Sequence, residues 1–326
     1  MTFSVLSPDD LGPTICAGEI LVEIVATTVG NGFFEAQPLI GPYPSGAPAI
    51  FISQCARMGN QSAMVGCVGD DDFGRVNITR LENDGVDVAG ISIDKDFPTG
   101  SAFVRYRSDG SRDFVFNIVQ SAASRFGWTA NVEKLAHRAG HLHVMGSALS
   151  MPAARGVIEQ AVTIIKARGG TLSVDPNLRK EIKQDADTAQ FFARLISMTD
   201  LLLPSGEELE LAAGIEGEAN AIGHLFKLGV KEIVLKRGGE GASYFAADGT
   251  QLHQSAFIVD EIDPTGAGDC FGGAYVACRR LGLSPDVALN YACAAGARNV
   301  TRRGPMEGAG TRAELDAFMA ATKRRT

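Results

Sequence analysis

The chain has 326 residues, which is long enough for one large α/β domain with a substantial core or for two small domains. Apolar residues make up 45% of the chain and charged residues 21%, as is ordinary for a folded globular protein. The formal net charge of -8 disfavours contact with nucleic acid or anionic lipid, so neither is expected as a partner. An anionic substrate is still compatible with this balance if basic groups are concentrated locally.

The six cysteines are scattered, with no C-x-x-C pair and no spacing typical of a zinc site. Scattered thiols in a chain of this length predict reduced core residues and a cytoplasmic location. The first residues lack the cationic stretch and apolar run of a signal peptide. No segment approaches the roughly 18 consecutive apolar residues of a membrane span, so no membrane association is expected.

Short apolar runs alternate along the chain with longer segments of helical period. The strand-like runs are Ala63–Val68, His141–Met145, Thr171–Val174, Leu201–Leu203 and Glu232–Leu235. The helical segments are Pro48–Met58, Phe73–Asn83, Ala153–Ala167, Glu208–Ala213 and Ala221–Leu228. Strands that alternate with helices predict crossover units and a parallel sheet covered on both faces.

Two stretches, at about residues 22–42 and 100–118, break this alternation. The second holds two β-like runs on either side of Asp109-Gly110, a dipeptide that favours a hairpin turn. Consecutive antiparallel strands inside an α/β chain predict a small separate sheet that serves as a lid or as a contact between subunits. A similar dipeptide, Asp248-Gly249, predicts an antiparallel addition at the edge of the main sheet. Because no repeat or linker is visible, we expect one domain over residues 1–326 that carries this lid.

The segment Asp263–Ala274, with the sequence DPTGAGDCFGGA, is the most informative in the chain. Thr265 is a good N-cap residue, and Gly266 and Gly268 allow a tight backbone whose N–H groups point one way. A glycine turn that opens a helix binds anions, because unpaired amides meet the positive end of the helix dipole. Asp269 falls in the first turn of this helix, where its alternative role is simply to stabilise the helix start.

The glycine turn and Asp269 together suit phosphoryl transfer. Preorganised N–H donors stabilise the negative charge on the transferred group, and a nearby carboxylate takes the proton of the acceptor hydroxyl. The segment is not a Walker A loop, because no G-x-x-x-x-G-K-[ST] occurs in the chain. It is not a Rossmann fingerprint either, because it lies near the C-terminus and no strand–turn–helix unit follows it.

DPTGAGDCFGGA resembles the C-terminal signature of the ribokinase-like (PfkB) carbohydrate kinase family, and the resemblance extends over about residues 17–304. It implies a three-layer α/β/α sandwich with a small β-sheet lid over a sugar, and catalysis with ATP and Mg²⁺. It also implies that Gly266, Ala267 and Gly268 form the anion hole and that Asp269 is the catalytic base. Whether a monovalent cation such as K⁺ is required stays open.

The resemblance also reaches residues on the sugar side. Gly18–Glu23 resembles the first strand of these kinases. Glu23 stands where many members have an Asp that contacts sugar hydroxyls. The alternative is that Glu23 faces solvent on an edge strand. Residues 45–50, SGAPAI, resemble a Gly-Gly-Ala-Pro-Ala-Asn segment whose glycines let the backbone approach the sugar; a plain helix start is the alternative. Arg179, in DPNLR, is a candidate for binding phosphate or a substrate carboxylate, or else lies on the surface. The sugar-side candidates are therefore Glu23, Gly46, Ala47, Ile50, Arg105 and Arg179.

On the nucleotide side, Ser205-Gly206-Glu207-Glu208 lies where the family carries Asn-x-x-Glu, a motif tied to magnesium and phosphate placement. Glu208 is therefore expected to act through magnesium-bound water, although Ser-x-x-Glu is also a capping box. The segment from Lys236 resembles the family's strand–Gly-x-x-Gly element along the nucleotide, where the lysine approaches ATP phosphates or faces solvent. The resemblance places Cys293 near adenine, and the alternative is a buried core thiol. The nucleotide-side candidates are Ser205, Lys236, Gly238, Gly241 and Cys293.

The resemblance implies an ATP-dependent sugar kinase that acts on a primary hydroxyl. The N-terminal third is most similar to bacterial tagatose kinases, with fructokinase and 2-keto-3-deoxygluconate kinase as close alternatives. At Ile50 and Ser205 the chain departs from the family's pattern, which has Asn at both positions, and this gives some support to a non-catalytic sugar or nucleotide sensor on the same fold. The intact Asp269 favours an enzyme. A nicotinamide-dependent oxidoreductase is disfavoured by the missing fingerprint. The uncovered face of the lid favours pairing as a homodimer.

Overall fold

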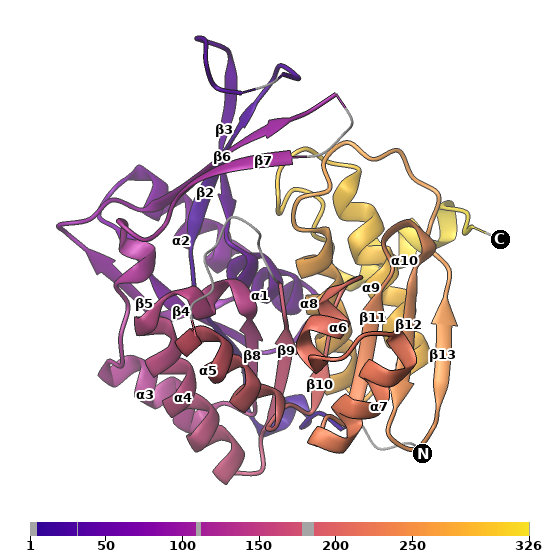
Figure 1. Ribbon diagram of the computed structural model, residues 1–326. Coiled ribbons are helices and arrows are strands. Elements are labelled where there is room, and N and C mark those ends of the chain that lie inside the picture. The colour runs from indigo at the N-terminus through magenta and orange to yellow at the C-terminus, as the bar shows by residue number, and fades with distance from the viewer. Residues whose placement is uncertain (1–4, 31, 109–111, 178–185, 326) are drawn as a thin grey trace.

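Figure 1 shows the computed structural model, which describes residues 5–30, 32–108, 112–177 and 186–325. Its centre is a nine-stranded sheet in the order β13-β12-β11-β10-β9-β8-β1-β4-β5. The strands from β11 to β5 run parallel, and β12 and β13 are antiparallel additions at one edge. These strands are β1 (Thr14–Ala17), β4 (Ser62–Gly69), β5 (Asp87–Asp94), β8 (His141–Met145), β9 (Thr171–Asp175), β10 (Leu201–Leu202), β11 (Glu232–Lys236), β12 (Ala242–Ala246) and β13 (Gln251–Gln254).

Helices cover both faces of the sheet, and each face has its own buried apolar cluster. One face packs against α1 (Ala47–Arg57), α2 (Asp72–Asn83), α8 (Ala267–Arg280), α9 (Pro285–Val300) and α10 (Arg312–Ala321). The other packs against α3 (Ala130–Arg138), α4 (Pro152–Ala167), α5 (Ala186–Ile196), α6 (Glu208–Ala213) and α7 (Glu218–Leu228). The expectation of a three-layer α/β/α sandwich is confirmed.

The strands and helices predicted from residue patterns are present, with ends shifted by one to a few residues. Each strand-like run lies in one of the strands β4, β8, β9, β10 and β11, and each helical segment lies in one of the helices above. Asp248-Gly249 joins β12 to β13, so the antiparallel edge addition is confirmed. Gly249 has φ +91°, a conformation that glycine adopts without steric cost.

The expectation that Gly18–Glu23 forms the first strand is wrong. The first strand is β1, which ends at Ala17, and the chain then crosses into a second sheet, where β2 begins at Leu21. Gly18 lies at the crossing, where an added Cβ would come within 2.6 Å of Pro48 Cγ. The apolar run is therefore divided between two sheets, and residue patterns alone do not reveal such a division.

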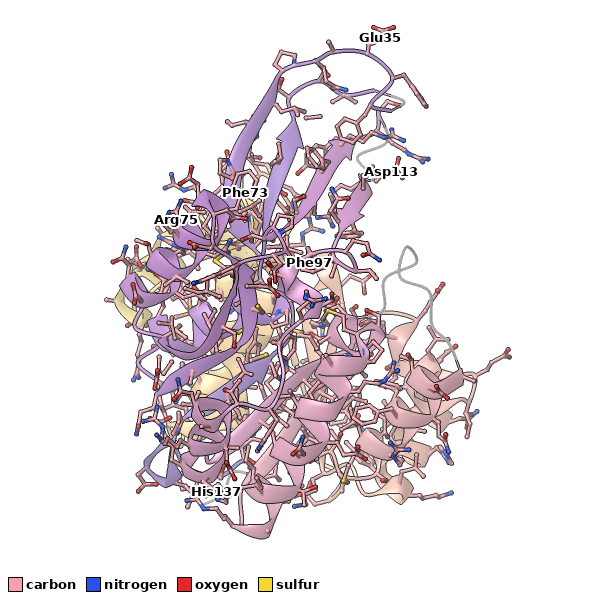
Figure 2. The ribbon with its side chains drawn as sticks, turned by 90° about the vertical axis from the view of Figure 1, so that its left-hand side faces the viewer. Glu35, Phe73, Arg75, Phe97, Asp113 and His137 are labelled. Carbon is pink, nitrogen blue, oxygen red and sulfur yellow. The ribbon has the colours of Figure 1, made fainter. Side chains whose placement is uncertain are left out.

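The second sheet has four strands in the order β3-β2-β6-β7 and stands away from the main body, with Glu35 near its far end (Figure 2). Its strands are β2 (Leu21–Ala26), β3 (Leu39–Ser45), β6 (Gly100–Tyr106) and β7 (Arg112–Asn117). Residues 22–42 and 100–118 supply most of it, and β2 pairs antiparallel with β3 and parallel with β6. Several apolar side chains on this sheet and its connections are exposed, namely Val29, Phe34, Leu39, Ile40 and Val115.

The six cysteines are buried free thiols. Burial raises the pKa of both Cys67 and Cys293 to about 11, so these two thiols stay protonated near neutral pH. Within the described ranges, no helix combines the length and the hydrophobicity that crossing a bilayer requires.

Helix α8 lies in the core and ends on two buried arginines, Arg279 and Arg280. The helix dipole favours cations at this end, but a buried guanidinium also needs hydrogen-bond acceptors. Arg280 donates to the carbonyl oxygens of Ser7 and Gly12, at 3.0 and 2.7 Å. It also donates to Thr14 Oγ1 at 2.7 Å. These bonds tie the N-terminal segment to the helix whose other end carries the glycine turn.

We expect Arg280→Met to lower the free energy of unfolding by about 3 kcal/mol, because it leaves buried acceptors without their donor. Urea unfolding followed by circular dichroism measures the change. Arg75→Met is the matched control, since the Arg75 side chain is 63% exposed and its ion pair with Asp72 contributes little. Equal losses in the two variants would contradict the role given to Arg280.

Candidate active site

The glycine turn opens α8 with a backbone that glycine adopts readily and other residues do not. Gly266 is the N-cap residue, with φ +77°, and an added Cβ would come within 2.3 Å of the Pro305 carbonyl oxygen. In the described part of the chain no side chain caps α8, which leaves the positive end of its dipole open to an anion. The expectation that Thr265 is the N-cap residue is wrong, because its Oγ1 instead accepts a hydrogen bond from Arg112 at 2.7 Å.

Two fully buried polar side chains hold this turn in place. The Asp263 carboxylate accepts hydrogen bonds from the backbone N–H groups of Thr265 and Gly304, both at 3.0 Å. The Asn299 amide donates to the Thr265 carbonyl oxygen at 2.8 Å. Hydrogen bonds in such a low-dielectric surrounding are strong, so the turn is fixed against the end of α9 and the loop that follows.

Asp269 lies in the first turn of α8 and is 4% exposed. Its Oδ1 atom accepts a hydrogen bond from the side-chain amide of Asn177 at 3.1 Å. Asn177 follows β9 and has φ +39°, a left-handed conformation that is uncommon outside glycine. The carboxylate is thus held beside the glycine turn by a residue from a distant part of the chain.

A buried ion pair lies next to the glycine turn. The Lys236 ammonium is 2.5 Å from Asp175 Oδ2, and it is 3.7 Å from the position of a Cβ added at Gly268. Burial raises the pKa of Asp175 to about 7, although Lys236 opposes the shift. Burial also works against the charge of Lys236, but the Asp175 and Glu208 carboxylates outweigh it and raise the lysine pKa. The lysine side chain is 12% exposed, so the alternative that it faces solvent is wrong.

Ser205 and Glu208 are paired, but only one half of a capping box is present. Glu208 Oε2 accepts hydrogen bonds from the backbone N–H of Ser205 at 2.8 Å and from its hydroxyl at 2.7 Å. The hydroxyl is therefore a donor to the carboxylate, and Glu207 is the N-cap residue of α6. The negative charge of Glu208 helps to raise the pKa values of both Asp175 and Lys236, so its carboxylate belongs to the same cluster of charges.

A cavity of about 320 Å³ opens beside the glycine turn. It brings together four nucleotide-side candidates, Lys236, Gly238, Gly241 and Cys293, with Ala267 and Gly268 of the turn. Its apolar lining includes Ala256, Phe257, Val259, Phe271, Ala297 and Val300. This volume, with an apolar wall and few polar groups, is typical of a small-molecule site. Cys293 is both buried and part of the wall, whereas Ser205 is not among the lining residues.

A smaller cavity, of about 20 Å³, brings together residues of α1 and the second sheet. Its lining includes four sugar-side candidates, Glu23, Gly46, Ala47 and Ile50, and adds Glu19, Ser45, Phe116 and Ser147. Glu23 is 5% exposed and accepts a hydrogen bond from Ser45 Oγ at 2.7 Å, so the solvent-facing alternative is wrong. Gly46 has φ +110°, and an added Cβ would come within 2.3 Å of the Glu19 carbonyl oxygen, so a side chain does not fit there.

One described sugar-side candidate, Arg105, is not brought to this cavity. Arg105 donates to the Gly30 carbonyl oxygen at 2.8 Å and forms an ion pair with Asp113, all within the second sheet and its connections. Arg179 lies outside the described residues. The cationic groups expected near the sugar are therefore not among the described residues that line the cavity.

Sequence reasoning missed three residues of the site. It considered the DPNLR segment only for its arginine and overlooked Asp175 and Asn177, which contact Lys236 and Asp269. Their place after a strand of a parallel sheet was the available signal, since ligands bind at that edge. Glu19 was overlooked beside Gly18, and its carboxylate accepts a hydrogen bond from Ser147 Oγ at 2.7 Å.

Comparison with known proteins gives consistent matches over nearly the whole chain. Residues 15–312 match the pfkB family carbohydrate kinases. Fructokinase-1 of Oryza sativa subsp. japonica is 32% identical over 311 residues, which cover 91% of this chain and 94% of that protein. An E. coli protein assigned as Ribokinase II, solved in its apo form, has a TM-score of 0.91 at 45% identity, covering 95% of this chain and 99% of that one. Its complex with ATP and Mg²⁺ has a TM-score of 0.89 at 44% identity, with the same coverage of 95% and 99%.

The fold and the matches together define an enzyme that transfers a phosphoryl group from ATP to a sugar. The chain belongs to the pfkB family of carbohydrate kinases. Its α/β architecture is accordingly ribokinase-like, as the sequence resemblance implied.

The Asp175–Lys236 pair predicts a pH dependence of nucleotide use. Below about pH 7 the Asp175 carboxyl is protonated, because burial raises its pKa to about 7, and it no longer holds the lysine by charge. We therefore expect kcat/KM for ATP to rise with pH and to level off above about 7, and Asp175→Asn to remove this rise. Steady-state kinetics across pH 5.5–9 measures both profiles. An unchanged rise of kcat/KM with pH in Asp175→Asn would contradict the assignment of this pH dependence to Asp175.

Proposed function

We propose that this kinase transfers the γ-phosphoryl group of ATP to the terminal hydroxyl of a neutral ketohexose. Asp269 is the general base in this proposal, and Gly266, Ala267 and Gly268 form the anion hole. The observation that carries it is the position of Asp269, a buried carboxylate in the first turn of an uncapped helix whose start lines the larger cavity.

The chemistry follows from these groups. The sugar hydroxyl oxygen forms a bond to the γ-phosphorus while the bond from that phosphorus to the β,γ-bridging oxygen breaks, and ADP leaves. The hydroxyl proton passes to the Asp269 carboxylate. Backbone N–H groups at the start of α8 and the Lys236 ammonium offset the charge on the equatorial oxygens of the transferring group.

Magnesium bound with ATP neutralises charge on the β- and γ-phosphates. The ion prefers oxygen donors and keeps several water ligands. Glu208 offers a carboxylate in the charge cluster around Lys236, where Ser205 orients it through two hydrogen bonds. We propose that Glu208 acts on the ion through one of these waters.

The second sheet is proposed to be a lid that closes over the sugar and excludes water from the transferring group. Support comes from its separation from the main sheet and from the residues it gives to the smaller cavity, among them Glu23 and Phe116. Its exposed apolar side chains, with Phe34 at 89% exposure, favour pairing with a second copy of the chain. Lid closure and homodimer formation both stay predictions.

Two observations support a neutral ketohexose as the sugar. Glu19 and Glu23 both line the smaller cavity, and two carboxylates disfavour an anionic group beside them. The rice relative reported above is named a fructokinase, so fructose is the first candidate. Tagatose, which the N-terminal third favoured, has no support from these comparisons and rests on sequence resemblance alone.

Asp269→Asn should lower kcat by about 10²-fold or more, because the amide cannot accept the hydroxyl proton. Binding of ATP should be largely unchanged, since the anion hole consists of backbone groups. Initial rates with saturating sugar and calorimetric titration with a non-hydrolysable ATP analogue measure the two quantities. Near-normal kcat in the variant would rule out the base assignment.

Glu208→Gln should raise the concentration of Mg²⁺ that half-saturates the rate, because a neutral amide orients metal-bound water less strongly. A magnesium titration at fixed ATP measures this shift. Ser205→Ala is the control, since it removes one hydrogen bond and leaves the carboxylate. If Glu208→Gln lowers only thermal stability and leaves the magnesium dependence unchanged, the residue has a structural role.

Neutral ketohexoses should exceed 2-keto-3-deoxygluconate and ribose in kcat/KM by about 10²-fold or more, because a site that bonds particular hydroxyls rejects analogues that lack them. Coupled-enzyme assays with fructose, tagatose, 2-keto-3-deoxygluconate and ribose measure the ranking. Glu23→Gln should narrow the gap to the ketoacid by removing a like charge. A preference for the ketoacid or for ribose would overturn the sugar assignment and leave the kinase class intact.

A further inference from the structure

The turn Asp175-Pro176-Asn177 leaves β9 at the carboxyl edge of the main sheet and is tightly held. The backbone N–H of Asn177 donates to Asp175 Oδ1 at 3.2 Å, which closes an Asx turn. The Pro176 carbonyl lies against Gly146, where an added Cβ would come within 1.7 Å of its oxygen. Asn177 keeps a φ of +39°, and strain of this kind persists where the surroundings enforce it.

The two polar side chains of this turn contact the two charged groups proposed for the reaction. Asp175 is fully buried and is paired with Lys236 beside the glycine turn. Asn177 donates from Nδ2 to Asp269 Oδ1 at 3.1 Å, across 92 positions of sequence. An ionised carboxylate oxygen only accepts hydrogen bonds, so the amide nitrogen is the atom that must face it. One short turn therefore holds both the cation and the carboxylate.

We propose that Asn177 is a positioning residue for phosphoryl transfer, and that its amide aims the Asp269 carboxylate at the acceptor hydroxyl. This inference rests on the proposed role of Asp269 as the base. A hydrogen bond to one carboxylate oxygen fixes the rotation of the group about its last bond, and it favours the ionised form that takes up a proton. Orientation of this kind matters because small displacements of a catalytic group cost large factors in rate.

Two substitutions at this position separate the amide from the backbone. Asn177→Gly keeps the left-handed conformation, which glycine adopts freely, and removes the side chain that carries the amide, including its contact with Met145 Sδ at 3.8 Å. Asn177→Asp keeps the size of the side chain and places a second carboxylate against Asp269. Asparagine and aspartate both tolerate the left-handed backbone conformation. The other charged groups of the cluster, Asp175 on β9, Lys236 on β11 and Glu208 at the start of α6, are the same in both variants. Their titration affects both rates, and the carboxylate added in Asn177→Asp couples to it, so the wild-type profile is measured alongside.

We expect Asn177→Gly to lower kcat by about 10- to 100-fold, the range for loss of a hydrogen bond to a charged group. Calorimetric binding of a non-hydrolysable ATP analogue should stay within about twofold of the wild type, since no group at the larger cavity changes. Near pH 9, Asn177→Asp should be slower than Asn177→Gly, because two like charges face each other. As the pH falls towards 6, the kcat of Asn177→Asp divided by that of Asn177→Gly should rise. The reason is that a proton shared by the two carboxyl groups restores a donor to Asp269.

Two results would overturn the proposal: wild-type kcat in Asn177→Gly, or a ratio of the two variants that does not change with pH. A purely structural role would lower both rates alike at every pH. Asp269→Asn, assayed in parallel, separates this proposal from the one it rests on. If Asp269→Asn is inactive while Asn177→Gly has wild-type kcat, only the positioning role fails. If Asp269→Asn keeps wild-type kcat, the base assignment fails, and the role of Asn177 fails with it.

Discussion

The start of α8 is the constraint on which the rest of the site depends. A buried helix that begins without a side-chain cap presents its positive end to whatever lies in front of it, and here that is the larger cavity. The arrangement requires a left-handed Gly266 packed against the Pro305 carbonyl. Asp263 and Asn299 hold the preceding residue, Thr265, through its backbone N–H and its carbonyl oxygen. Because Asp269 is three residues into the same helix, fixing the turn also fixes the distance from the carboxylate to the proposed anion site.

Charge in the site is arranged locally and against the acidic balance of the whole chain. Lys236 keeps its charge although it is buried, because Asp175 and Glu208 face it. Burying such a pair costs desolvation energy that the ion pair offsets only in part, so stability is a poor explanation for its presence. Perturbed ionisable groups beside a cavity are instead typical of functional sites. Backbone amides and one lysine thus form the proposed anion site in a protein with a net charge of -8.

Local signals predicted much of this architecture. Period and residue type were enough for β4, β8 and β9 and for the helices α2 and α4. The glycine turn with Asp269 was found because its residues are consecutive. The contacts that hold the site were out of reach, since Asn177 meets Asp269 across 92 residues and only the folded sheet brings them together. The crossing at Gly18 was missed for a related reason, because an apolar run does not tell which of two sheets it joins. The Ser205 hydroxyl donates to the Glu208 carboxylate and does not accept from the Glu208 backbone N–H, so a capping pattern in the sequence does not establish that both capping bonds form.

A crystal structure of the enzyme with sugar, ADP and aluminium fluoride would test the central claim most directly, because the fluoride complex mimics the transferring phosphoryl group. The account predicts that this group lies on the backbone N–H groups of Gly266, Ala267 and Gly268. It also predicts that an Asp269 carboxylate oxygen lies about 2.6–3.2 Å from the terminal hydroxyl of the sugar. A fluoride complex bound away from the start of α8, or a sugar hydroxyl out of reach of Asp269, would contradict it.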